Sequence, residues 1–160
     1  MSTITIYDGI TLNNSGKFSY QQQIEATIRI NQSVNWGGYG ASSVQSDSLF
    51  AVTDDKIIGY VSCFGTYIAF MAVEADSQRL GAGKKLLERV FVDAKEKNRP
   101  TVTLDFRGEV KETGIKNTKL INFYTNVALP YILEMEGCGN YGNKNGVTEL
   151  RYSIEYKIKP

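Results

Sequence analysis

One segment, from Met71 to Leu87, constrains the fold more than any other part of the sequence. It begins as an apolar run typical of a buried strand, passes through Gly81 and Gly83, and continues as an amphipathic helix. Glycine permits a sharp turn and lets a ligand approach the main chain, because no Cβ stands in the way. The first turn of the helix adds unpaired N–H groups and the positive end of the helix dipole. The segment therefore predicts a binding site for a phosphate or a pyrophosphate.

Two common phosphate-binding motifs do not match this segment. A Walker A loop needs a glycine well before its Gly-Lys pair and a Ser or Thr after it, but Gln78 and Lys85 stand at those positions. A Rossmann fingerprint needs a third glycine, and Leu86 stands there instead. Glycines after a strand are also often only a tight turn, so that simpler interpretation stays open at this point.

The composition excludes several other classes of site. No histidine is present, which excludes a Ser-His-Asp or Cys-His mechanism and removes the commonest metal ligand, and we predict no metal. The two cysteines, Cys63 and Cys138, form no Cys-x-x-Cys pair and are interpreted as free thiols. Lys plus Arg is 18 and Asp plus Glu is 17, a balance that argues against a nucleic-acid partner. No apolar run is long enough to span a membrane and no signal peptide is visible, so we expect a cytoplasmic protein.

The order of predicted elements indicates one α/β domain over residues 1–160. Apolar periodicity predicts an opening strand around Ile4 with a turn near Asp8, helical structure over 19–33, and strands over 48–53, 56–64 and 67–73. It then predicts a helix that ends near residue 98, a strand over 101–106, a helix over 120–127 and strands over 131–135 and 147–158, with loops at 107–116 and 137–146. A strand–helix–strand crossover among antiparallel strands is typical of a mixed sheet.

The glycine segment resembles a known signature. Its pattern Gln78-x-x-Gly81-x-Gly83 is similar to the acetyl-CoA-binding motif of the GNAT superfamily of N-acyltransferases, and Val73 stands where that family has its strand-ending Val. The run from Asn117 to Tyr124 resembles the family's later Asn-x-x-Ala-x-x-Phe-Tyr helix. The resemblance implies a GNAT-like fold, which is a central, mostly antiparallel sheet with helices on both faces.

The resemblance also implies a donor and its contacts. The donor would be acetyl-CoA, used as a co-substrate, with its pantetheine arm lying beside the strand like an added strand. Tyr124 would protonate the departing thiolate, or would be a core aromatic beside Phe123. The contacts to the donor would come from Met71 and Val73 in the strand, from Gln78, Arg79, Leu80, Gly81, Ala82, Gly83 and Lys84 in the turn, and from Asn117, which also fits a helix cap.

Side chains for the acceptor are less closely constrained by the sequence. Glu74 and Asp105 are both expected near strand ends on the crossover side, so either is a candidate base. The alternatives are a solvated strand end for Glu74 and a paired surface carboxylate for Asp105. Trp36 and Tyr39 lie in a glycine-rich segment that would face the acceptor, or would form an ordinary loop anchored by its Trp.

These observations lead to one leading function and two alternatives. The leading function is transfer of an acetyl group from acetyl-CoA to a primary amine of a small molecule or a protein, by direct attack of the amine. Holding the two reactants in line can supply most of the rate enhancement of this transfer, so a histidine is not required. The alternatives are a CoA-binding regulatory or interaction module without turnover, and a toxin-like enzyme that acetylates aminoacyl-tRNA. Members of the family often pair as homodimers.

Overall fold

The computed structural model describes residues 3–34, 48–110, 115–116, 118–144 and 147–160. The chain divides into two compact units, Met1–Arg89 and Val90–Pro160, which are described separately below. In both units every strand pairing described is antiparallel, and helices lie between groups of strands along the chain. The predicted mixed α/β class with a mostly antiparallel sheet is confirmed. The extent of the domain stays a prediction.

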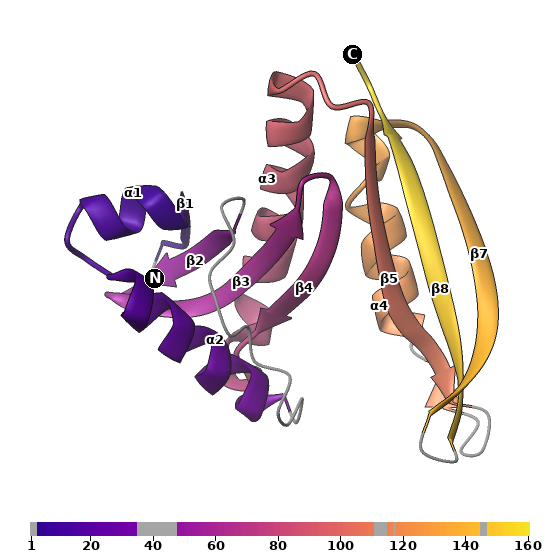
Figure 1. The fold of residues 1–160 in the computed structure, drawn as a ribbon, viewed down its shortest axis with the longest axis horizontal. Coiled ribbons are helices and arrows are strands. Elements are labelled where there is room, and N and C mark those ends of the chain that lie inside the picture. Colours follow the sequence, from indigo (N-terminus) through magenta and orange to yellow (C-terminus); the bar gives the residue numbers. More distant parts are fainter. Residues whose placement is uncertain (1–2, 35–47, 111–114, 117, 145–146) are drawn as a thin grey trace. The chain divides into compact units, whose positions relative to one another are not determined.

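The first unit contains four antiparallel strands in the order β1-β2-β3-β4 (Figure 1). The last of its helices, α3, crosses from the first unit into the second, since the unit boundary falls at Arg89. The elements in chain order are β1 (Thr5–Asp8), α1 (Gly9–Asn14), α2 (Tyr20–Ser33), β2 (Leu49–Thr53), β3 (Lys56–Phe64), β4 (Tyr67–Val73), the 3-10 helix η1 (Ala75–Leu80) and α3 (Ala82–Glu96).

Side-chain caps determine where the first two helices begin. Asp8 accepts hydrogen bonds from the Thr11 amide at 2.8 Å and from the Thr11 hydroxyl at 2.7 Å, so the turn expected near Asp8 is the start of α1. Ser19 and Gln22 form a capping box, in which each side chain accepts from the other residue's amide. Such caps satisfy N–H groups that have no partner inside the helix.

Strand β3 is covered on both faces within the first unit. A Cβ built on Gly59 would lie 3.3 Å from the Leu86 side chain, so this position faces α3. The next residue, Tyr60, donates its hydroxyl hydrogen to Asn31 of α2 at 2.7 Å. Successive residues of a strand point to opposite faces, so α2 and the beginning of α3 lie on opposite sides of β3. The sequence predicted β4 as a buried strand, but most of its residues are only partly buried, and β3 is the more fully buried strand.

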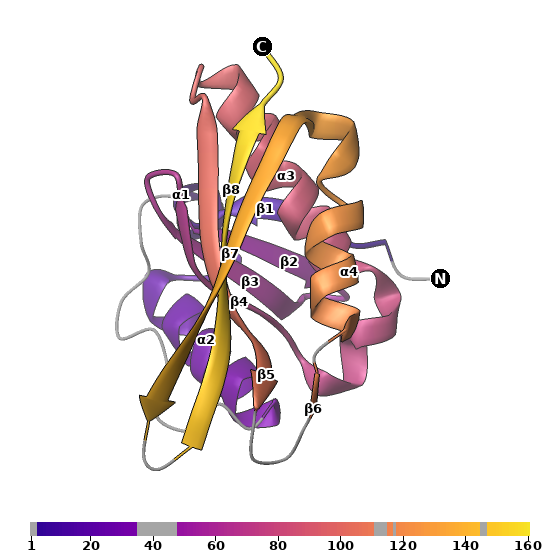
Figure 2. The ribbon, with the colours of Figure 1, turned by 90° about the vertical axis from the view of Figure 1, so that its right-hand side faces the viewer.

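The second unit is built around a long hairpin (Figure 2). Its strands pair in the order β5-β8-β7, and the short strand β6 pairs with β5. The elements are β5 (Thr101–Val110), β6 (Ile115–Lys116), α4 (Thr118–Asn126), the 3-10 helix η2 (Leu129–Tyr131), β7 (Ile132–Lys144) and β8 (Val147–Ile158).

Two of the predicted loops are wrong in this unit. The segment expected as a loop over 137–146 is mostly strand, because β7 pairs with β8 from Ile132 opposite Ile158 to Lys144 opposite Val147. Glycine and asparagine lower the intrinsic preference for strand, but ladder hydrogen bonds use the main chain alone and β8 offers a long partner. Strand β5 likewise continues to Val110, into the segment that was expected as a loop over 107–116.

Candidate functional site

The glycine turn has the backbone geometry of an anion site. Strand β4 ends at Val73, η1 follows, and Gly81 adopts a φ of 83°, a left-handed conformation that glycine reaches without strain. The Lys85 amide donates to the Gly81 carbonyl at 3.2 Å and so begins the hydrogen-bond ladder of α3. The amides of Ala82, Gly83 and Lys84 precede it and have no acceptor inside the helix. These three N–H groups lie at the positive end of a long helix.

The side chains of the turn are mostly open to solvent. Gln78, Arg79, Leu80 and Lys84 are exposed, whereas Ala82 is buried. The side-chain nitrogen of Gln78, Nε2, donates to the Val73 carbonyl at 3.3 Å, which links the turn to the end of β4. A positive charge from Arg79 or Lys84 is thus available beside the free amides.

Glu74 lies between the strand and the turn and is buried, with 8% of its surface exposed. One carboxylate oxygen, Oε1, is 3.0 Å from Arg29 of α2 and 2.9 Å from the Lys56 ammonium at the start of β3. The other oxygen, Oε2, accepts a hydrogen bond from the Ser77 hydroxyl at 3.3 Å. The alternative of a solvated strand end is therefore wrong.

The ion pairs of Glu74 change its acid–base properties. Burial by itself would raise the pKa of this carboxyl, but the hydrogen bond and charge of Lys56 and the charge of Arg29 outweigh burial and hold the pKa below its usual range. A carboxylate stabilised in this way is a weak proton acceptor. The geometry favours a structural role for Glu74, and its role as a base stays a prediction.

Tyr124 lies in α4 of the second unit and is buried to the same extent, with 8% of its surface exposed. Its ring packs against Phe106 and Phe123, with centroids 5.0 Å and 5.2 Å away. Its carbonyl accepts a hydrogen bond from the Tyr156 hydroxyl at 2.8 Å. Burial raises the pKa of the Tyr124 phenol to about 12, so the group keeps its proton at neutral pH.

Asp105 and Tyr124 lie on opposite faces of β5. The Tyr124 ring packs against Phe106, so the face of β5 that carries Phe106 is the face covered by α4. Neighbouring strand residues alternate between faces, and Asp105 is exposed on the other one. The structure of this unit therefore does not bring the two predicted catalytic side chains together.

The remaining predicted site residues divide into two groups. Met71 and Val73 lie in β4, where both are half-buried and pair with Val61 and Gly59 of β3. Trp36, Tyr39 and Asn117 lie outside the described residues.

Three residues that the sequence analysis missed surround Glu74. Arg29, Lys56 and Ser77 come from three different elements, and Arg29 is far from Glu74 in the sequence. The one local signal was Arg29 itself, the only basic residue of α2, which interrupts the apolar positions of that helix. Nothing in that pattern indicates its partner.

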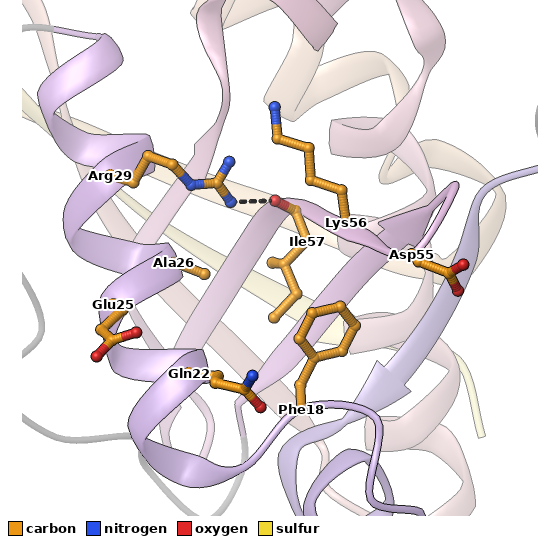
Figure 3. A pocket seen from close by; sticks show the side chains of 8 residues that line it. All are labelled: Phe18, Gln22, Glu25, Ala26, Arg29, Asp55, Lys56 and Ile57. Carbon is orange, nitrogen blue, oxygen red and sulfur yellow. Dashed lines mark hydrogen bonds between the residues drawn. The ribbon is translucent and has the colours of Figure 1, made fainter.

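A shallow hollow of about 310 Å³ borders these ion pairs, between α2 and the turn that joins β2 to β3 (Figure 3). Phe18, Ala26 and Ile57 supply apolar lining. Its two cations, Arg29 and Lys56, are both bound to Glu74, and Arg29 also donates to the Ile57 carbonyl at 2.6 Å. Glu74 thus compensates part of the positive charge at this hollow from within the unit.

Among the residues that the structure describes, no helix is long and apolar enough to cross a membrane. No group of three or more metal-ligating side chains occurs among those same residues.

Comparison with known proteins places the glycine turn within a family. Residues 45–127 match the family model described as "Acetyltransferase (GNAT) domain", and this match covers more than half of the 160-residue chain. No curated protein matches the chain in sequence.

Solved structures with the same fold are distant in sequence. The ribosomal-protein-S18-alanine N-acetyltransferase from Escherichia coli has 17% identity and a TM-score of 0.63, over 100% of this chain and 96% of that one. The protein yncA from Salmonella typhimurium, solved with its cofactor acetyl-CoA, has 15% identity and a TM-score of 0.63, over 98% and 94%. The diaminobutyrate acetyltransferase EctA from Paenibacillus lautus, solved with L-2,4-diaminobutyric acid and coenzyme A, has 12% identity and a TM-score of 0.63, over 99% and 96%.

Proposed function

The chain belongs to the GNAT acetyltransferase family and is an acyltransferase, and we propose that it transfers acetyl from acetyl-CoA to a primary amine by direct attack of the amine on the thioester. The acceptor we propose is an amine of a small molecule or of a protein. Proteins of the same fold act on both classes, since the one from Escherichia coli is named for a protein alanine and the one from Paenibacillus lautus was solved with a diamino acid.

One observation supports this proposal more than any other. The amides of Ala82, Gly83 and Lys84 have no acceptor inside α3 and follow directly on the left-handed Gly81. A helix end stabilises an anion by only about 1 kcal/mol, so we propose that these amides act together with the exposed Arg79 and Lys84 side chains on the pyrophosphate. Gln78 and Leu80 complete this turn.

The pantetheine arm is assigned to β4 by the same proposal. Main-chain groups of Met71 and Val73 would hold the arm as an added strand, and Asn117 would contact it near the thioester. Acetyl-CoA supplies the activated acetyl group when bound. Each of these contacts keeps the reacting atoms in line, which can lower a barrier by roughly 7–11 kcal/mol.

Tyr124 is the proposed proton donor to the sulfur. The N–C bond forms as the C–S bond breaks, and the proton that the amine loses balances the one that the sulfur gains. With a pKa of about 12, the phenol is protonated at neutral pH and can donate a hydrogen bond to sulfur as negative charge develops. For the base that takes the proton from the amine, Glu74 and Asp105 stay the predicted candidates.

The test of this function has two stages. Titration calorimetry with CoA and acetyl-CoA should show binding of both by the purified protein. A turnover assay against polyamines, amino acids, aminoglycosides and peptides should then find an acceptor. If neither CoA nor acetyl-CoA binds, the proposed reaction has no donor and the proposal fails.

Two alternatives are separated by the same assays. Binding of CoA without acetyl transfer to any amine would favour a regulatory or interaction module. Competition between tRNA and the acceptor would favour acetylation of aminoacyl-tRNA. The cytoplasmic location and a homodimer stay predictions, to be checked by fractionation and by light scattering.

A further inference from the structure

We propose that Glu74 is a positioning residue, which holds the glycine turn in its binding conformation through Arg29, Lys56 and Ser77. This inference rests on the proposed function, because it assigns the turn to CoA. It gives Glu74 a different role from the base predicted above. The two roles make opposite predictions about which kinetic constant depends on this carboxylate.

Helix α2 contacts the start of the turn at two points. Arg29 donates to the Glu74 carboxylate at 3.0 Å, and one helical turn later the Ser33 hydroxyl accepts a hydrogen bond from the Ala75 amide at 3.1 Å. Residues four apart in a helix lie on the same face, so one side of α2 holds two consecutive residues of the chain. The Arg29 guanidinium also donates to the Ile57 carbonyl at 2.6 Å, as Figure 3 shows, and so links α2 to β3.

Glu74 makes hydrogen bonds both to β3 and to η1. Its amide donates to the Ile58 carbonyl of β3 at 2.7 Å. Toward η1, its carbonyl accepts from the Ser77 amide at 2.9 Å, and its carboxylate accepts from the Ser77 hydroxyl at 3.3 Å. Ser77 is itself buried, within η1. Glu74 therefore links β3 and α2 to the 3-10 helix that precedes Gly81.

The partners of the charged Glu74 carboxylate fix its orientation. A buried carboxylate is stable only where opposite charges and hydrogen bonds compensate for lost water. Lys56 and Arg29 both approach the same oxygen, and Ser77 donates to the other, so each oxygen is used. The carboxylate cannot rotate toward a substrate without giving up these partners.

A turn that already has its binding conformation binds a ligand more tightly, because it loses less conformational entropy on binding. The amides of Ala82, Gly83 and Lys84 follow η1 directly, so a shift of η1 would move them. Removal of the Glu74 charge should thus weaken CoA binding and leave the chemical step unchanged.

The test compares Glu74→Gln with Glu25→Gln. The first substitution keeps the shape of the side chain and removes its charge. The second removes a charge from an exposed position of α2, where Glu25 accepts a hydrogen bond from the Gln21 side chain. We expect Glu74→Gln to raise the Kd of CoA and the KM of acetyl-CoA about tenfold, with kcat at saturating acetyl-CoA within about threefold of the parent. Glu25→Gln should change none of them.

Ser77→Ala is the second variant, since it removes a contact of the network and no ionisable group. We expect a rise of about threefold in the Kd of CoA and no change in the pH profile of kcat. The positioning role is overturned if Glu74→Gln lowers kcat about a hundredfold and removes the acidic limb of the pH profile while the Kd of CoA is unchanged, because that is the behaviour of a base.

Hydrogen exchange without ligand separates this inference from the proposed function. In Glu74→Gln we expect the amides of residues 75–85 to exchange about ten times faster than in the parent, with β7 and β8 unchanged. A parent protein that binds no CoA would remove the proposed function, yet faster exchange would still support the positioning role. Unchanged exchange in Glu74→Gln overturns the positioning role whether or not CoA binds.

Discussion

Glu74 in the first unit and Tyr124 in the second are buried to the same degree, and their ionisable groups respond in opposite ways. Each has 8% of its surface exposed. Cations at 3.0 Å and 2.9 Å keep the Glu74 carboxylate charged, whereas aromatic rings surround the Tyr124 phenol and keep it neutral. Burial alone therefore does not determine the charge of a group, because the partners available at the site decide it.

The two buried groups suit two different roles in the proposed reaction. A group that is held charged by two cations suits the positioning of a turn, and a group that keeps its proton suits donation to a departing thiolate. Affinity for CoA should then depend on the first unit and turnover on Tyr124. Substitutions in both units test this division, and those at Gly83 and Tyr124 should change the measured constants most.

Gly83→Glu tests whether affinity depends on the turn. A bulky anion beside the free amides would occupy the place of the pyrophosphate, so we expect the Kd of CoA to rise by at least about a hundredfold. Calorimetry measures the change, and Lys95→Glu, in the last turn of the same helix, provides a control. Tight binding of CoA by the Gly83 variant would contradict the assignment of the turn.

Tyr124→Phe tests whether turnover depends on the phenol. General acid catalysis contributes about a hundredfold or more, so we expect kcat to fall by about that factor while the Kd of CoA stays nearly the same. Steady-state kinetics and calorimetry on one preparation measure both. Phe123→Leu is a packing control with no lost hydroxyl, and an unchanged kcat in Tyr124→Phe would remove the proposed role.

Arg29→Gln tests the charge compensation of Glu74. The substitution leaves a buried carboxylate with one cation, and because Arg29 is 40% exposed we expect a loss of about 2 kcal/mol in the free energy of unfolding, below the full cost of breaking a buried pair. The pKa of Glu74 is lowered in the folded state, so its stabilising contribution is present above the ordinary pKa and disappears as the pH falls through the folded value. Urea unfolding should show the two proteins converging below about pH 4.5.

Tyr124 should produce the opposite pH dependence, at the alkaline end. Its pKa is raised from 10.0 to about 12, so the folded state loses stability as the pH rises through that window. The parent should lose about 1.4 kcal/mol more than Tyr124→Phe by pH 11, which urea unfolding at pH 8 and pH 11 measures. Parallel losses in both proteins would contradict the raised pKa.

Asp55→Gly should have the smallest effect. It removes an exposed carboxylate near the ion pairs of Glu74. Asp54 and Asp55 have φ of 49° and 59° in a turn closed by the pair Thr53–Lys56, a geometry that favours Asn-Gly. We expect Asp55→Gly to stabilise the protein by about 0.5 kcal/mol, since glycine adopts this φ without strain. A clear loss of stability in thermal unfolding would show that this carboxylate contributes to the Glu74 ion pairs.

Local sequence was sufficient where turn chemistry limits a strand. Strands β3 and β4 have the bounds that the sequence predicted, because the turn signals Asp54-Asp55 and Gly65 lie directly beside them. Strand β8 also has its predicted bounds. Strand β7 was predicted too short, since its glycines and asparagines lack strand preference and its pairing with β8 is what orders them. The predictions for Trp36, Tyr39 and Asn117 lie outside the described residues.

The sequence by itself determined the mixed α/β class, the strand–turn–helix with its glycine signature and the family, because each depends on residues close together in the chain. Tertiary structure alone decided that Glu74 is buried and paired with Arg29, and that Asp105 and Tyr124 lie on opposite faces of β5. The physical reason is that the charge state of a buried group depends on partners brought to it by folding, and no local pattern specifies which distant side chain will arrive.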